Sequence, residues 1–165
     1  DIADRSKLDH LSFSAGSIEN FDSTGADVLI ALHACDTATD DAIAKGIAAE
    51  SELIVVAPCC HKQIRREMET ANHTTDIDFV TRHGIFMERE AEMVTDAMRA
   101  MILEYFGYST KVFEFVGTEH TPKNVLIVAQ KTRRGRDAAQ LKKFKEAKTY
   151  FGIRKHYLED AVGIV

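Results

Sequence analysis

The sequence predicts an α/β domain with a doubly wound, mostly parallel sheet that ends in an antiparallel hairpin. Two continuous apolar runs, at 27–34 and 52–58, are each followed by a helical pattern, which is typical of buried strands in a parallel sheet. Two later apolar runs, at 109–117 and 123–132, are separated only by the short loop TEHTP, so they are expected to pair antiparallel. The chain has 165 residues, of which 45% are hydrophobic and 28% charged, as expected for one globular domain.

The remaining elements follow from hydrophobic periodicity and from residues that start or stop helices. We expect a first strand at 11–16, helices at 36–50, 61–71, 87–108 and 137–151, and a polar loop at 74–85. The helix at 36–50 opens with acids and threonines, which favour a capped N-terminus. The helix at 87–108 carries Met and Ala residues along one side and has Gly107 as its stop.

The net charge of −5 hides an asymmetry between the two ends of the chain. Residues 131–155 hold ten Lys or Arg against two acids, and the rest is acidic. Such a basic segment is either a surface that binds RNA or another polyanion, or a solvated helix face, and both interpretations stay open. The three cysteines are odd in number and two are adjacent, so a disulfide framework is not expected. We expect a cytoplasmic protein without membrane contact, because no apolar run has the length of a membrane span.

Histidines and cysteines gather where two strands are expected to end, in HACD at 33–36 and PCCH at 58–61. Parallel strands that neighbour each other bring their carboxyl ends to one edge of the sheet, where ligands bind. A zinc site would use more widely spaced pairs, and the side chains of adjacent residues are expected to diverge, so we expect no metal. Cys35 and Cys60 precede helices, which can activate a thiolate, whereas Cys59 is expected to be a small buried residue.

The third interpretation of the cluster is the rim of a small-molecule pocket. Its polar groups are His33, Asp36, Thr39 and Asp40, which follow the strand end at which the sheet opens to solvent. We expect functional roles for His33 and Asp36 in particular.

Four stretches, GSIENF, ALHACDTATD, VVAPCCHKQ and EFVGTEHTPKNVLIVAQK, resemble the class I methyltransferases that depend on S-adenosylmethionine (SAM). The similarity is to the branch with the motifs L-H-x-C-x-x-x-T-D and P-C-C-H, which includes tRNA ribose 2′-O-methyltransferases and related methyltransferase-like proteins. The resemblance covers residues 1–132 and implies a Rossmann-like partial methyltransferase domain there. Residues 133–165 would then be a basic helical extension packed on that domain.

The resemblance also implies roles for single residues. It assigns SAM binding to Asp1, Ser17, Ile18 and His33, catalysis to His33, Cys35 and Asp36, and the acceptor side to Pro58, Cys60, His61 and Asn124. His33 would remove a proton from the acceptor, because an imidazole titrates near neutral pH. Asp36 would orient His33 or the acceptor.

The sequence departs from that family in one respect, since no Gly-rich turn follows a first strand. The opening residues DIADRSK resemble the segment that follows the second strand in that family, so we expect this chain to be the C-terminal portion of a longer protein. The strand at 27–34 would then be an exposed edge that pairs with another copy or with 11–16. The function implied is methyl transfer from SAM to tRNA or rRNA; the alternative is a non-catalytic methyltransferase-like module that binds nucleic acid or a protein partner.

Overall fold

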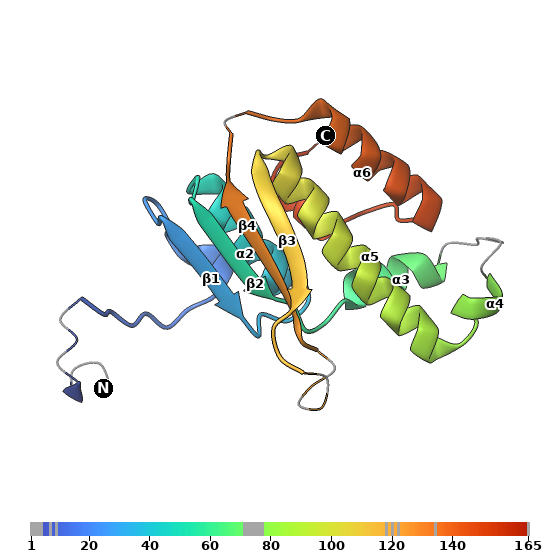
Figure 1. The fold of residues 1–165 in the computed structure, drawn as a ribbon, viewed down its shortest axis with the longest axis horizontal. Helices are drawn as coiled ribbons and strands as arrows, with labels where there is room; N and C mark the ends of the chain where they lie inside the picture. Colours follow the sequence, from blue (N-terminus) through green and yellow to red (C-terminus); the bar gives the residue numbers. More distant parts are fainter. Residues whose placement is uncertain are drawn as a thin grey trace.

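The computed structural model describes residues 5–6, 8, 10–70, 78–117, 119, 121, 123–133 and 135–164. Its centre is one four-stranded sheet in the order β1-β2-β4-β3 (Figure 1). The strands are β1 (Val28–Leu32), β2 (Leu53–Ala57), β3 (Tyr108–Glu114) and β4 (Val125–Lys131). β1 and β2 are parallel, whereas β4 is antiparallel to both β2 and β3. The α/β class and the hairpin are confirmed, but the described sheet is mixed and not mostly parallel.

Helices account for most of the remaining described chain. They are η1 (Ile18–Asn20), α2 (Thr37–Ala48), α3 (Lys62–Thr70), α4 (Asp78–Thr81), α5 (Gly84–Tyr105), α6 (Ala138–Phe151) and α7 (Tyr157–Ala161). α6 begins where the Asp137 carboxylate accepts a hydrogen bond from the backbone N–H of Ala139 (2.9 Å). It ends at Gly152, whose φ of 65° is the left-handed conformation that glycine adopts at helix ends.

Three expectations about these elements are wrong. The stretch at 11–16 forms no strand: Leu11 and Phe13 are 58% and 81% exposed, and the chain there has no strand to pair with. The polar loop at 74–85 contains α4 and the start of α5, apart from residues 74–77, which lie outside the described residues. α7 was not expected, because five residues are too few to show a helical period.

The described helices cover one face of the sheet. On β1 the side chains of Leu29 and Ala31 pack against the core, while those of Val28, Ile30 and Leu32 are 50%, 62% and 59% exposed. Successive strand residues point to opposite faces, so this alternation means that the second face carries no helical layer within the described chain. The expectation of a doubly wound sheet is therefore wrong for the described residues. The expected exposed edge at 27–34 is confirmed, because β1 is the outer strand.

The covered face forms one hydrophobic core to which the sheet and the C-terminal helices both contribute. It joins Ile54 and Ile127 of the sheet to Met98 of α5, Phe144 of α6 and Leu158 of α7. α6 packs on α5 and α7 on α2, so residues after 133 share the core of the preceding domain. None of the helices in the described chain combines the length and the apolar character that crossing a membrane requires.

Candidate functional site

The turn after β1 holds the first group of predicted site residues in an unusual backbone conformation. His33 and Asp36 have φ values of 60° and 54°, a region that few residues with a side chain adopt. Such strain persists where the surroundings enforce it, and it is common at functional sites. The side chains of His33 and Cys35 are exposed at this turn.

Asp36 connects this turn to the one after β2. Its Oδ1 accepts a hydrogen bond from the backbone N–H of Gln63 (3.2 Å), in the first turn of α3. A carboxylate is favourable there, because the first N–H groups of a helix have no partner inside the helix. Asp36 thus holds the HACD and PCCH turns together, which the sequence did not indicate.

The three thiols of the chain meet between these turns. The Sγ atom of Cys59 lies 3.2 Å from that of Cys35 and 3.8 Å from that of Cys60, and all three lie within 4.8 Å of one another. Adjacent cysteines were expected to diverge, and this premise is wrong. Burial, together with the contacts to Cys35 and Cys60, raises the pKa of Cys59 to about 12, so in the metal-free protein this thiol is protonated at neutral pH. Cys59 is therefore unsuited to act as a nucleophile.

A buried ionic network lies behind the two turns. The fully buried Arg99 of α5 donates from Nε to Asp40 Oδ1 (2.7 Å) and from Nη1 to Asp96 Oδ1 (3.0 Å). Its Nη2 donates to the backbone carbonyl of Asp36 (2.9 Å). Burial raises the pKa of Asp40 even though the Arg99 charge opposes the shift. Arg99 thereby ties α5 to the start of α2 and to the strained turn.

Two of the expected rim residues are inside the protein. Asp40 is 2% exposed and bonds to Arg99, and Thr39 is 1% exposed and donates from its hydroxyl to the carbonyl of Ala34. The expectation that both line the pocket rim is wrong, because the first turn of α2 rotates them toward the core.

The residues assigned to the acceptor side lie at the same edge of the sheet, but most are buried. Pro58 is buried and Cys60 half-buried. His61 is 4% exposed, and its Nε2 donates to Asp96 Oδ1 (3.1 Å). Asn124 is 2% exposed and donates from its amide to the carbonyl of Val116 (2.8 Å), which closes the β3–β4 connection. The structure gives His61 and Asn124 structural contacts, and their contact with an acceptor stays a prediction.

A groove of about 540 Å³ runs along the free edge of β1 and brings two of the predicted cofactor residues together. Ile18, Phe21 and His33 line it together with the apolar residues of β1. Ser17 is exposed, and its Oγ accepts a hydrogen bond from Asn20 (2.9 Å). Asp1 lies outside the described residues.

These groove residues suit one part of SAM. Ile18 and Phe21 offer apolar and aromatic surface for the flat face of an adenine ring, and the His33 side chain lines the same groove. A carboxylate for the ribose hydroxyls is not among the described residues that line the groove. The fit therefore concerns the base of the cofactor, and contact of His33 with the methyl group stays a prediction.

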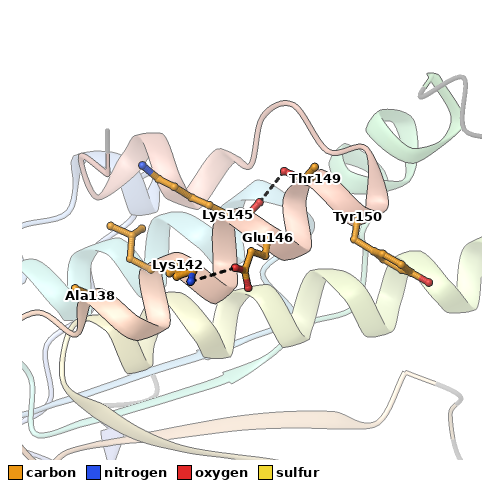
Figure 2. A pocket seen from close by; sticks show the side chains of 7 residues that line it. Ala138, Lys142, Lys145, Glu146, Thr149 and Tyr150 are labelled. Carbon is orange, nitrogen blue, oxygen red and sulfur yellow. Dashed lines mark hydrogen bonds and ion pairs between the residues drawn. The ribbon is translucent and has the colours of Figure 1, made fainter.

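A second surface groove lies on α6, within the basic segment. Figure 2 shows Lys142, Lys145 and Tyr150 projecting from this helix, with Glu146 ion-paired to Lys142 (3.8 Å). Tyr150 is 61% exposed, which is unusual for a large aromatic side chain. Exposed cations and an aromatic ring on one helix are groups that contact phosphates and stack on bases.

Sequence reasoning missed Asp96 and Arg99. The available signal was a pair of opposite charges three residues apart in a mostly apolar stretch of α5, DAMRAMIL, where a buried charge needs a partner. The pattern could not identify Asp40 as that partner, because it lies 59 residues from Arg99.

Comparison with known proteins points in the direction of the resemblance. A family model described as a methyltransferase domain matches residues 1–67, which is less than half of the chain but includes η1 and both His/Cys turns. The match supports a methyltransferase family and methyl transfer in general. Neither the curated proteins nor the solved structures yielded a match to this chain.

Proposed function

We propose that the protein is a SAM-dependent methyltransferase whose acceptor is RNA, either tRNA or rRNA. The observation that carries the proposal is the groove along β1. It joins Ile18 to His33 inside the part of the chain that the methyltransferase family model matches. Methyltransferase domains typically use SAM, and the apolar and aromatic lining suits its adenine.

The residues at the turn after β1 supply the rest of the chemistry. SAM, when bound, provides an electrophilic methyl group, so the protein must align the acceptor and take up its proton. His33 is exposed in the groove and can accept a proton from a hydroxyl or an amine. Asp36 fixes the turn through Gln63, and Arg99 fixes it through the backbone carbonyl of Asp36. Both act on the position of His33.

An RNA acceptor is supported by the surface of α6. Lys142, Lys143 and Lys145 are exposed on this helix, and the exposed ring of Tyr150 lies on the same element. The basic segment is partly neutralised, since Lys142 pairs with Glu146 (3.8 Å), Lys148 with Glu159 and Lys155 with Asp160 (2.6 Å). The lysines of α6 named above are exposed, so phosphate can reach them despite these pairs.

Two measurements test the enzyme. The first is calorimetric titration of SAM into the chain and into Ile18→Asp, which places a carboxylate against the adenine end of the groove. We expect binding that weakens at least about tenfold in the variant, since one unfavourable contact of about 1.4 kcal/mol gives that factor. The second is transfer of labelled methyl from SAM to total RNA, which His33→Ala should reduce about 10²-fold or more while SAM affinity stays within a few-fold. No SAM binding by the unmodified chain, alone or extended upstream through the expected Gly-rich turn, would refute the proposed function.

The RNA part has its own test. Binding of fluorescent single-stranded RNA by Lys142→Ala/Lys145→Ala is compared with binding by Lys111→Ala, an exposed lysine on β3. The salt dependence of the affinity should fall by about 1.4 log units per log unit of salt for the loss of two phosphate contacts, and by much less for the control. Equal salt dependence in all three proteins would remove α6 as the RNA surface while leaving the SAM tests unaffected.

A further inference from the structure

The cysteine cluster of the two turns has a geometry that the methyltransferase proposal does not use. Cys35 comes from the turn after β1, and Cys59 and Cys60 come from the turn after β2. Their three Sγ atoms form a triangle with sides of 3.2 Å and 3.8 Å, and a third side within 4.8 Å. The chain has three cysteines, and all of them are in this triangle.

We propose that the three thiolates bind a soft d¹⁰ cation, Zn²⁺ or one like it, with a fourth position open to solvent. Zinc binds cysteine sulfur at about 2.3 Å in tetrahedral geometry, which places two sulfurs of one site about 3.8 Å apart. The Cys59–Cys60 separation of 3.8 Å equals this value, and the 3.2 Å between Cys35 and Cys59 needs only a small expansion. Each thiol that binds releases its proton to solvent, and the sulfur lone pair forms the bond to the metal.

Two of the three thiols, those of Cys35 and Cys60, lie beside helix starts that favour anionic sulfur. Cys35 immediately precedes Asp36, the N-cap of α2, and Cys60 lies two residues before α3 begins. The N-terminal ends of these helices carry partial positive charge, which stabilises nearby thiolates. The Asp36–Gln63 hydrogen bond holds the two helix starts together, so most of the order that the site needs exists before the ion binds.

Exposure decides what kind of site this is. Cys35 is exposed and the other two thiols are half-buried, so one side of the triangle faces solvent. Structural zinc sites have four protein ligands, whereas sites with three protein ligands keep a position for water or a substrate atom. The thiol triangle belongs to the second kind. This inference does not depend on SAM or RNA binding.

The test uses the chain in a phosphine reductant after treatment with a chelator. Co²⁺ is added as a spectroscopic probe, and the Zn²⁺ affinity is measured by competition with a coloured chelator. We expect one ion per chain, a thiolate-to-cobalt charge-transfer band, and protection of all three thiols from a disulfide reagent by one equivalent of Zn²⁺.

Three variants locate the site. Cys59→Ser removes the central sulfur, and Cys35→Ser removes an exposed one, so circular dichroism should show that its fold is unchanged. Each should weaken Zn²⁺ binding at least about 100-fold, since even the loss of a group that only supports a ligand costs 10–100-fold. His83→Ala, an exposed histidine outside the triangle, should leave the affinity unchanged. The inference is overturned if no charge-transfer band appears, if the three thiols stay reactive with Zn²⁺ present, or if Cys35→Ser binds as tightly as the unmodified chain.

Discussion

Replacing Arg99 by Met tests whether the buried network holds the site together. Arg99 is fully buried and makes three hydrogen bonds, to Asp40, to Asp96 and to the carbonyl of Asp36. Met fills similar volume but leaves the two carboxylates and the carbonyl without this partner. Breaking a buried ion pair by removing one partner costs about 3–5 kcal/mol, which is a large share of the 5–15 kcal/mol that holds a domain folded.

The pH dependence of this loss identifies its cause. Burial already raises the pKa of Asp40, and removing the Arg99 charge raises it further. A carboxyl with a raised pKa binds more protons in the folded state than in the unfolded state, so the variant should lose stability as the pH rises through the folded pKa. The deficit relative to the unmodified chain should therefore be larger at pH 8 than at pH 5.

Urea unfolding followed by circular dichroism at the two pH values measures this deficit. Asp40→Asn in the Arg99→Met background serves as the control, because it removes the unpaired charge and should recover part of the loss. Arg65→Met, whose guanidinium is paired on the surface with Glu69 (2.9 Å) and Glu88 (2.6 Å), should cost less than about 1 kcal/mol. A deficit below 1 kcal/mol for Arg99→Met, or one that does not change with pH, would refute the reasoning.

Two further predictions concern stability. Burial, with the nearby charges of Arg99 and Lys148, lowers the pKa of His156 to about 3, so below pH 6.5 only the unfolded chain gains a proton. The contribution of His156 to stability should fall by about 1.4 kcal/mol per pH unit between pH 6 and 4. His156→Asn, whose amide oxygen can replace the ring nitrogen that caps α7, should flatten the pH dependence in urea titrations, and an unchanged slope would contradict this. A Cβ on Gly46 of α2 would lie 2.6 Å from Cδ1 of the buried Ile54. Gly46→Ala should therefore lower the free energy of unfolding by about 1 kcal/mol, despite the better helix propensity of alanine. A gain in thermal stability would contradict this prediction.

The strand ends were predictable because they depend on local patterns. The apolar runs at 27–34 and 52–58 and their abrupt polar ends predicted that both His/Cys turns lie at one edge of the sheet, and the structure places them there. The direction in which each side chain points was harder to predict from the sequence. Thr39 and Asp40 follow the strand by a few residues, yet the helical turn points them inward, toward an arginine that enters from α5.

Two features needed three-dimensional information. Whether Cys59 and Cys60 could face a common point depends on the backbone after β2 and on the approach of Cys35, neither of which spacing determines. The uncovered sheet face could not be predicted from the sequence either, because Val28, Ile30 and Leu32 are as apolar as residues that a helical layer would cover. Composition predicts which residues can be buried but does not supply the element that buries them.

In the described sheet, β1 has a paired strand on one side only. The turn after β1 therefore has few neighbours to hold it, and the position of His33 depends on the contacts of Asp36. The hydrogen bond from Gln63 N–H to Asp36 is the contact that we expect to position His33. Asp36→Asn should retain this hydrogen bond, since an amide oxygen also accepts from a backbone N–H, whereas Asp36→Ala should lose it. We expect Asp36→Ala to increase amide hydrogen exchange in the first turn of α3 and to lower methyl transfer about tenfold, and Asp36→Asn to change either by less than threefold. Equal loss of methyl transfer in both variants, with exchange raised only in Asp36→Ala, would instead assign the negative charge itself to the reaction, as an electrostatic partner of His33.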